Sequence, residues 1–308
     1  MTTLDRSVDA SRPFGAHLAM RWWAPILLTL LVVGATYILQ FLFLAAAAIV
    51  EVGLWGKDPN DPTLTPLTYL ATNVAIILIA PLSLLALRVT SKAPWRSAMA
   101  LGRRFSWRRL GSYMALFAGL MVVLNLLIHL VEPSPTSAFA ITGTTVALLV
   151  IVLLTTPLQA AAEEIAFRGV LTASYAAWIR AARPALVVGI GLSTVLFALL
   201  HTSSDPWMLL NYLGLGASTA LIALIGRGLE ASIAFHAMNN VFAMVIGSLF
   251  AYGGGISQDR SAGAAGPYML LSLLAQAVAV LLVWRIEKRR ATAAMEDKGF
   301  AAGRDSST

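Results

Sequence analysis

The chain has 308 residues, of which 58% are hydrophobic and only 12% are charged, and its mean hydropathy is +0.77. Soluble domains carry about 25% charged residues, so this composition excludes an ordinary soluble globular protein. Lys and Arg residues number 22 against 15 Asp and Glu residues, which gives a net charge of +7. The absence of cysteine excludes disulfides, thiolate metal sites and a cysteine nucleophile.

Apolar runs of about 20 residues, the length that crosses a bilayer, recur along the chain. They predict an all-α, polytopic membrane bundle of about eight transmembrane helices. The first run is too long for the apolar core of a cleaved signal peptide, so we expect it to remain as a span. The expected spans cover residues 25–50, 66–87, 111–131, 138–162, 184–201, 209–226, 230–252 and 267–285.

The positive charges indicate how the bundle is oriented. If the N-terminus lies in the cytoplasm, only Lys57 and Arg260 of the 22 basic residues fall outside, which leaves 20 inside. The positive-inside rule predicts this split for eight spans with both termini cytoplasmic. Every basic segment adjoins a span, so the net charge reports orientation, and we expect no nucleic-acid partner.

We expect one integral membrane domain over residues 1–308, with catalytic core helices in 138–252. The polar stretches 1–20 and 287–308 predict flexible tails. The expected location is the cell membrane, as a multi-pass protein of a bacterial plasma membrane, with lipid as its surroundings. The sequence does not indicate an oligomeric state.

Two adjacent carboxylates, Glu163 and Glu164, interrupt an apolar stretch, and Arg168 follows. A charge inside the hydrocarbon costs at least about 2.5–3.5 kcal/mol, so such a pair indicates a functional site. On a helix Glu164 and Arg168 share a face, whereas Glu163 is rotated by about 100° from Glu164. We therefore expect Arg168 to neutralise Glu164, and Glu163 to face a cavity as a general base. The alternative is a headgroup-level cluster in which both glutamates pair with Arg168.

Phe197 and His201 form a second cluster, at the end of the fifth expected span. If the preceding turn centres near Ala182, Glu163 and His201 each lie nineteen residues from it and reach the same depth in antiparallel helices. A shared site requires that these two side chains lie at the same depth. The alternative is an ordinary interfacial histidine.

A third cluster consists of His236 and Asn240, which share one helical face, with Asn239 beside them. The same spacing places two ligands on one metal in zinc-binding helices, but these side chains could also join helices by hydrogen bonds. His236 is only about eight residues from its cytoplasmic turn, so it meets Glu163 only if the 163–183 hairpin extends into the cytoplasm or the helices tilt. Interhelical hydrogen bonds are expected for Gln159, His129, Asn211 and Tyr212.

The three clusters read EEIAFR from Glu163, FALLH from Phe197 and HAMNN from His236. Together they resemble the CPBP family of intramembrane proteases, the CAAX-processing, bacteriocin-processing and Abi-like group that includes the type II CAAX prenyl endopeptidases. That family carries EExxxR, FxxxH and HxxxN or HxxxD motifs in this order on successive helices. The match covers about 80 residues of a chain that has the expected eight-helix size.

The resemblance implies hydrolysis of a peptide bond in a hydrophobic or lipid-modified membrane peptide or protein. It implies that Glu163 activates water with help from His201, and that His236 and Asn240 stabilise the oxyanion. The supporting residues that it implies are Glu164, Arg168, Phe197 and Asn239.

The same four groups, Glu163, His201, His236 and Asn240, could instead hold a divalent metal such as zinc. A base with an oxyanion hole is the metal-free alternative, and no HExxH zinc signature is present. Two other functions remain open at this stage. A proton-coupled transporter would use glutamate and histidine relays, although inverted repeats are not evident. A non-catalytic scaffold or immunity protein would retain the motifs without hydrolysis.

Overall fold

The computed structural model describes residues 7–61 and 63–305. Eight helical segments are long and apolar enough to cross a membrane, and within the described ranges there is no strand, only three isolated bridges. The predicted all-α bundle of eight spans is thus confirmed. The spans are α1 (Ala24–Gly53), α2 (Pro66–Ile77) with α3 (Ile79–Ser91), α5 (Trp107–Val131), α6 (Gly143–Glu164) with its extension, α8 (Ala182–Leu200), α9 (Pro206–Gly226), α10 (Glu230–Leu249) and α11 (Met269–Asp305).

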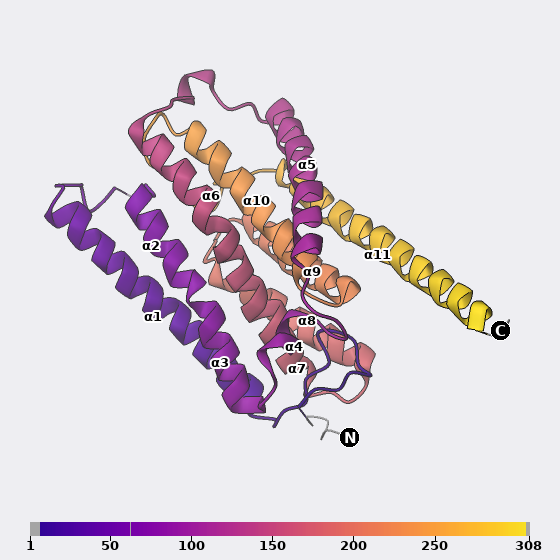
Figure 1. Ribbon diagram of the computed structural model, residues 1–308. Helices are drawn as coiled ribbons and strands as arrows, with labels where there is room; N and C mark the ends of the chain where they lie inside the picture. The colour runs from indigo at the N-terminus through magenta and orange to yellow at the C-terminus, as the bar shows by residue number, and fades with distance from the viewer. Residues whose placement is uncertain (1–6, 62, 306–308) are drawn as a thin grey trace.

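Helix α10 lies at the centre of the bundle, where it packs against α5, α6 and α9 (Figure 1). Half of an apolar 18-residue stretch of α10 is buried inside the protein, against 11% of the corresponding stretch of α1 at the edge. Small residues on α10, such as Ala231, Ser232 and Ala234, are fully or almost fully buried and allow neighbouring helices to approach closely. The helix that carries the third motif is therefore enclosed by protein on several sides.

The fourth span is one continuous helical segment of 34 residues, Gly143–Ala176. It joins α6 to the π-helix η2 (Ile165–Leu171) and then to α7 (Thr172–Ala176). At 1.5 Å per residue it is about 50 Å long, more than the roughly 30 Å of a hydrocarbon core. The helix continues past residue 162, where the expected fourth span ends, and its length places Glu163 well before the hairpin at its end.

The second span is broken at Leu78, which the sequence reading of a single 66–87 helix did not anticipate. The cause lies at Pro81. Proline has no N–H to donate to the carbonyl of residue 77, and its ring crowds that carbonyl. Helix α2 therefore ends at Ile77, and α3 begins at Ile79 and continues to Ser91. A short helix, α4 (Trp95–Met99), follows before α5.

The N-terminal segment differs from the expected flexible tail. Phe14, His17 and Leu18 are 1% exposed or less, and the His17 ring stacks on Phe14 with centroids 5.1 Å apart. Nε2 of His17 lies 3.0 Å from the carbonyl oxygen of Ser97. Burial lowers the pKa of His17 from its ordinary value of 6.5 to about 4. Residues 7–20 thus pack onto the bundle, while residues 1–6 lie outside the described part.

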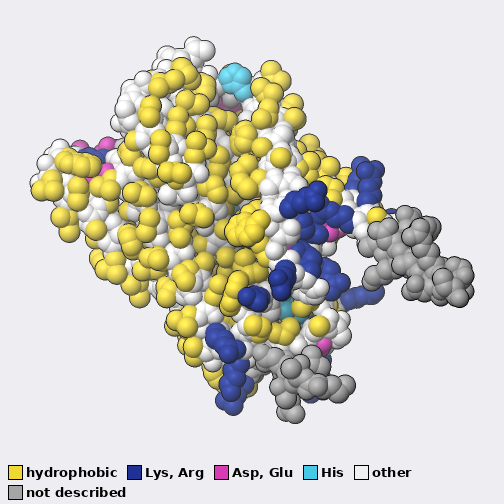
Figure 2. All heavy atoms as spheres, in the orientation of Figure 1, with side chains coloured by type: hydrophobic (Ala, Val, Ile, Leu, Met, Phe, Trp, Pro, Cys, Tyr) yellow, Lys and Arg dark blue, Asp and Glu magenta, His cyan; other side chains and the backbone are white. Residues whose placement is uncertain are grey.

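The C-terminal stretch also differs from the expected tail, because α11 continues as a helix to Asp305, and residues 306–308 lie outside the described part. Both ends of the chain lie toward one end of the bundle (Figure 1). Figure 2 shows most visible Lys and Arg side chains gathered at that end, below a broad apolar surface. This asymmetry fits the positive-inside pattern, and the cytoplasmic assignment of that end remains a prediction.

Candidate active site

A cavity of about 460 Å³ brings the three motifs together. Glu163 lines it from α6, His201 from the end of α8, and Asn240 from α10. Residues of α1 and α2 form the opposite wall, including Tyr37 and Asn73. Side chains that are far apart in the sequence thus share one hollow inside the bundle.

His236 lies between the two glutamates. Its Nδ1 is 2.9 Å from Oε1 of Glu164, and its Nε2 is 3.4 Å from Oε2 of Glu163. The Glu164 side chain is completely buried, whereas 14% of the Glu163 side chain is exposed, toward the cavity that it lines. A histidine whose Nδ1–H donates to a carboxylate is held in one tautomer and one orientation, as in hydrolase triads.

Arg168 completes the buried network. Its Nε lies 3.4 Å from Oε2 of Glu164 and donates a hydrogen bond of 2.8 Å to Oγ1 of Thr219. The guanidinium carbon lies 4.6 Å from the ring centroid of Phe197, a cation–π geometry. Arg168 and Glu164 therefore form the expected i,i+4 pair, and Phe197 supports that pair besides lining the cavity.

His201 has one ring nitrogen engaged and one free for chemistry. Nδ1 lies 2.7 Å from the backbone carbonyl oxygen of Phe197. Because a carbonyl only accepts, Nδ1 must carry the hydrogen, and Nε2 of the neutral ring keeps its lone pair. The ring stacks on Tyr212 with centroids 4.1 Å apart, which fixes its plane. The sequence did not assign Tyr212 to this site.

Amide side chains form another part of the cavity wall. Asn239 donates to Oδ1 of Asn240 at 3.1 Å, and Nδ2 of Asn240 contacts Oε1 of Gln159 at 3.4 Å. These contacts orient the Asn240 amide group between α6 and α10. Gln159, expected to make an interhelical hydrogen bond, makes this one and also lines the cavity. Asn211 likewise bonds Gln276 of α11, at 2.8 Å.

The expected metal ligands do not converge. Within residues 7–61 and 63–305, no group of three or more His, Asp or Glu side chains is placed to hold a metal ion. The donors are committed elsewhere, because both ring nitrogens of His236 face carboxylates and Nδ1 of His201 faces a carbonyl. This arrangement does not fit a metal centre, and we derive no step through a metal.

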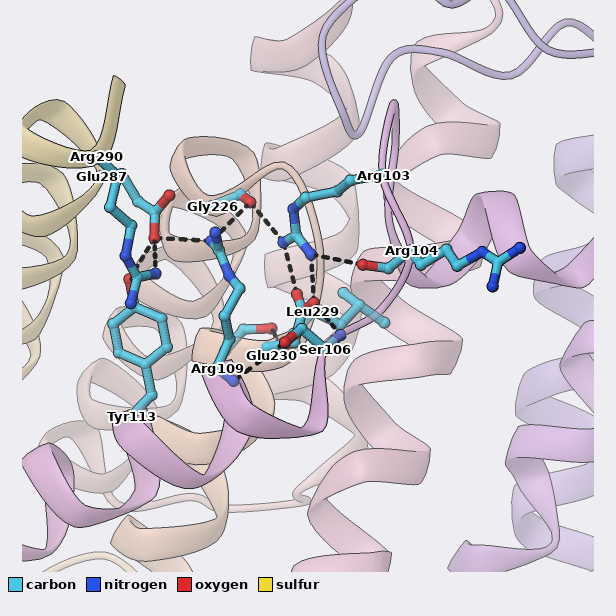
Figure 3. Close-up of polar contacts among 11 residues, drawn as sticks. Arg103, Arg104, Ser106, Arg109, Tyr113, Gly226, Leu229, Glu230, Glu287 and Arg290 are labelled. Atoms are coloured by element: carbon cyan, nitrogen blue, oxygen red, sulfur yellow. Dashed lines mark hydrogen bonds and ion pairs between the residues drawn. The ribbon is translucent and has the colours of Figure 1, made fainter. Parts of the chain in front are cut away.

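A polar network fixes the start of α10 (Figure 3). Glu230, 1% exposed, forms an ion pair with Arg103 and accepts a 2.8 Å hydrogen bond from the Ser106 backbone N–H. Arg103 also donates to the Gly226 carbonyl at 2.8 Å. His236 follows Glu230 by less than two helical turns, so these contacts anchor the segment that carries it. Sequence reading overlooked this anchor, although an acid at the first position of an apolar span is a signal.

Comparisons with known proteins agree with this geometry. Residues 143–242 match the family described as "Rce1-like: Type II CAAX prenyl endopeptidase Rce1-like". The uncharacterized protein YyaK of Bacillus subtilis (strain 168) is 28% identical over 188 residues, which are 58% of this chain and 60% of YyaK. The chain thus spans less than two thirds of that relative's length. No solved structure matches the chain significantly.

All three motifs, from Glu163 to Asn240, fall inside the matched segment. The resemblance drawn from the motifs is therefore confirmed. The matched segment also covers α6, α8 and the first part of α10, the helices that bring Glu163, His201 and Asn240 to the cavity. Over residues 143–242, this membrane protein is thus similar to the Rce1-like type II CAAX prenyl endopeptidases.

Proposed function

We propose that the chain is an intramembrane endopeptidase in which Glu163 activates a water molecule. One observation carries the proposal: His236 bridges a fully buried Glu164 and a Glu163 that opens into the cavity. Hydrolysis requires water, a base and stabilisation of developing charge, and lipid supplies none of these. A polar cavity inside a helix bundle provides all three.

The roles follow from the contacts. Arg168 and Glu164 hold His236, whose Nε2 faces one oxygen of Glu163 and leaves the other oxygen for water. Glu163 takes a proton from that water as its oxygen attacks the peptide carbonyl carbon. The lone pair on Nε2 of His201 accepts a hydrogen bond from the second O–H of the water, which keeps that hydrogen, and so orients the attack.

The later steps need an oxyanion donor and a proton donor. The side-chain amide of Asn240 donates to the carbonyl oxygen as it becomes negative. Glu163 then returns its proton to the leaving nitrogen as the carbon–nitrogen bond breaks. The substrate class supported by a cavity between spans is a hydrophobic or lipid-modified peptide that lies in the membrane.

The test compares cells that carry the wild-type chain with cells that carry Glu163→Gln at equal expression. Glutamine is nearly isosteric but cannot take a proton, so we expect normal folding and a loss of turnover of about 10²–10⁴-fold. Membrane-derived peptides are compared by mass spectrometry, with exposed Glu132→Gln as the matched control. Fragments present only with wild type and Glu132→Gln support proteolysis. Identical peptides from all three, with every protein folded, favour the non-catalytic scaffold.

A further inference from the structure

The outer face of α11 carries a groove that the proposed mechanism does not use. Helix α11 lies at the edge of the bundle, where it packs against α9 and α5 (Figure 1). The groove has a volume of about 510 Å³, and it is lined by Trp284, Arg285, Lys288, Arg289, Thr292 and Ala293. All of these residues are exposed, so the groove opens away from the protein.

The cations of this groove have no acidic partner. Among the side chains that the structure describes, no ion pair includes Arg285, Lys288 or Arg289. Glu287 is the only acid in residues 284–293, and it faces α5 instead (Figure 3). Its Oε1 accepts hydrogen bonds from Arg109 at 2.7 Å, from Arg290 at 2.8 Å and from the Tyr113 hydroxyl. The positive charge of the groove is therefore available to an anion from outside the chain.

Trp284 places the groove at the boundary between hydrocarbon and water. Helix α11 has no charged residue from Met269 to Trp284, and the cations of the groove follow directly. Nζ of Lys288 lies 5.2 Å from the ring centroid of Trp284, a cation–π geometry. Tryptophan is enriched at membrane interfaces, at the level of the lipid headgroups. The cations of the groove thus lie at the depth where lipid phosphates are found.

A second groove, at the end of α3, has a similar composition. It has a volume of about 500 Å³ and is lined by Leu84, Leu85, Arg88, Pro94 and Trp95. Here too a tryptophan and an arginine follow an apolar helix. Nη1 of Arg88 donates to the carbonyl oxygen of Lys92, so this guanidinium is already partly engaged within the chain. The groove on α11, with three unpaired cations, is therefore the stronger candidate for binding an anion.

We propose that the groove on α11 binds the headgroup of an anionic phospholipid. Guanidinium and ammonium groups donate charge-assisted hydrogen bonds to phosphate oxygens, and the net negative charge of such a lipid complements the cations. The exposed side chains of Leu274, Leu281 and Trp284 continue the surface of α11 into the hydrocarbon, where acyl chains lie. A soluble phosphate would leave this apolar surface unused, so the groove fits a lipid better. The site does not depend on the proposed proteolysis.

The experiment measures lipid binding to the full-length chain in detergent. Native mass spectrometry gives dissociation constants for dioleoyl phosphatidylglycerol and dioleoyl phosphatidylcholine, which share acyl chains but differ in net charge. We expect the wild-type protein to bind phosphatidylglycerol at least about tenfold more tightly, because basic residues next to a span attract anionic lipids. Arg285→Gln combined with Arg289→Gln should remove most of this preference. The matched control, Arg180→Gln combined with Arg183→Gln at two exposed arginines near the start of α8, should keep it.

Equal affinities of the wild-type protein for the two lipids overturn the inference, as does a preference that survives the α11 substitutions. An equal loss in both double variants would mean that total charge governs binding, and it also overturns the groove. Unchanged affinity for phosphatidylcholine shows that the α11 variant is folded, whereas a parallel fall for both lipids would indicate a structural effect and contradict the proposal. Displacement of phosphatidylglycerol by millimolar glycerol 1-phosphate would assign the cations to soluble phosphates instead of lipid.

Discussion

Glu164 is the most enclosed acid of the site, with no exposed side-chain surface. A buried carboxylate is tolerated only when it is paired, and removing one partner of a buried pair leaves the other charge uncompensated. Here the partners are Arg168, itself 1% exposed, and His236. Glu164 thus supports the site without facing the cavity, while Glu163 is the carboxylate available to water.

Replacing Glu164 should therefore affect stability before chemistry. We expect Glu164→Gln to destabilise the protein by about 3–5 kcal/mol, because the Arg168 charge loses its counter-ion in a dry interior. Thermal unfolding in detergent measures this as a lower melting temperature. Glu132→Gln, at an exposed position, should melt like wild type. A wild-type melting temperature for Glu164→Gln would mean that Arg168 does not depend on this pair.

Metal removal should leave turnover unchanged. Nδ1 of His236 is hydrogen-bonded to Glu164 and its Nε2 faces Glu163, so a metal would have to displace these contacts. Peptide cleavage by wild-type membranes is measured after dialysis against EDTA or 1,10-phenanthroline, followed by a gel shift that verifies the fold. A loss of cleavage that added zinc restores would show that the site rearranges around a metal.

For individual residues of the site, the sequence predicts contacts between residues close together in the chain but not contacts between residues far apart in it. The contact of Glu164 with Arg168 follows from i,i+4 spacing. The bridge made by His236 connects residues 72 positions apart, and depth counting from the turns argued against it. Depth depends on how far a helix runs past the hydrocarbon, and spacing alone does not encode that length.

Helices α7 and α8 approach each other closely at Gly189. A Cβ at this position would lie 2.5 Å from the carbonyl oxygen of Thr172, closer than real contacts allow. Gly191, two residues on in the same helix, has nothing within 4 Å of such a Cβ. The close approach positions α8, which carries Phe197 and ends at His201.

The two glycines make a matched pair. Gly189→Ala should push α8 away from α7, lower the melting temperature and reduce cleavage, because Phe197 and His201 move with the helix. Gly191→Ala should be neutral or stabilise by up to about 1 kcal/mol, since alanine favours helix over glycine. Melting temperature and cleavage are measured for both proteins. Equal behaviour of the two variants would show that the Gly189 contact can relax without cost.

The long apolar runs correctly predict the membrane-spanning helices, but they do not predict where a helix is interrupted. The break at Leu78 follows from Pro81, a signal that was present but outweighed by a continuous apolar run. The π-helix from Ile165 to Leu171 has no such signal in the sequence, and it contains the buried Arg168. Phe14, Ala16 and Leu18 alternate with less apolar residues, and this alternation could have indicated that the N-terminal segment is packed.

On the scale of the whole molecule, the N-terminal segment should dock in a pH-dependent way. Burial lowers the pKa of His17 to about 4, with a smaller contribution from Arg12. Between pH 6.5 and 4 the released segment binds a proton that the docked segment does not, so docking is strongest above pH 6.5 and weakens as pH falls. A spin label on Ala10→Cys should become more mobile at pH 5 than at pH 7.5. In a His17→Gln background the mobility should not respond to pH, and a response there would assign the titration elsewhere.

The orientation of the bundle can be tested because the chain has no cysteine of its own. Single cysteines at Asp58 or Asp259 should react in intact cells with a thiol reagent that cannot cross membranes, since the positive-inside rule places these loops outside. Cysteines at Arg104 or Arg289 should react only after the cells are opened. The reverse pattern would invert the orientation of every span.

The walls of the cavity come from two separate parts of the chain. The family match covers residues 143–242, so it includes the motif residues but not α1 and α2, which also line the cavity. Under the proposed function, the motif helices would supply the reaction chemistry, while α1 and α2 would contact the substrate. Substitutions in residues 24–77 could then change which peptide binds while the motif residues stay the same. Exchanging that stretch between related chains should transfer their preferences and keep their chemistry.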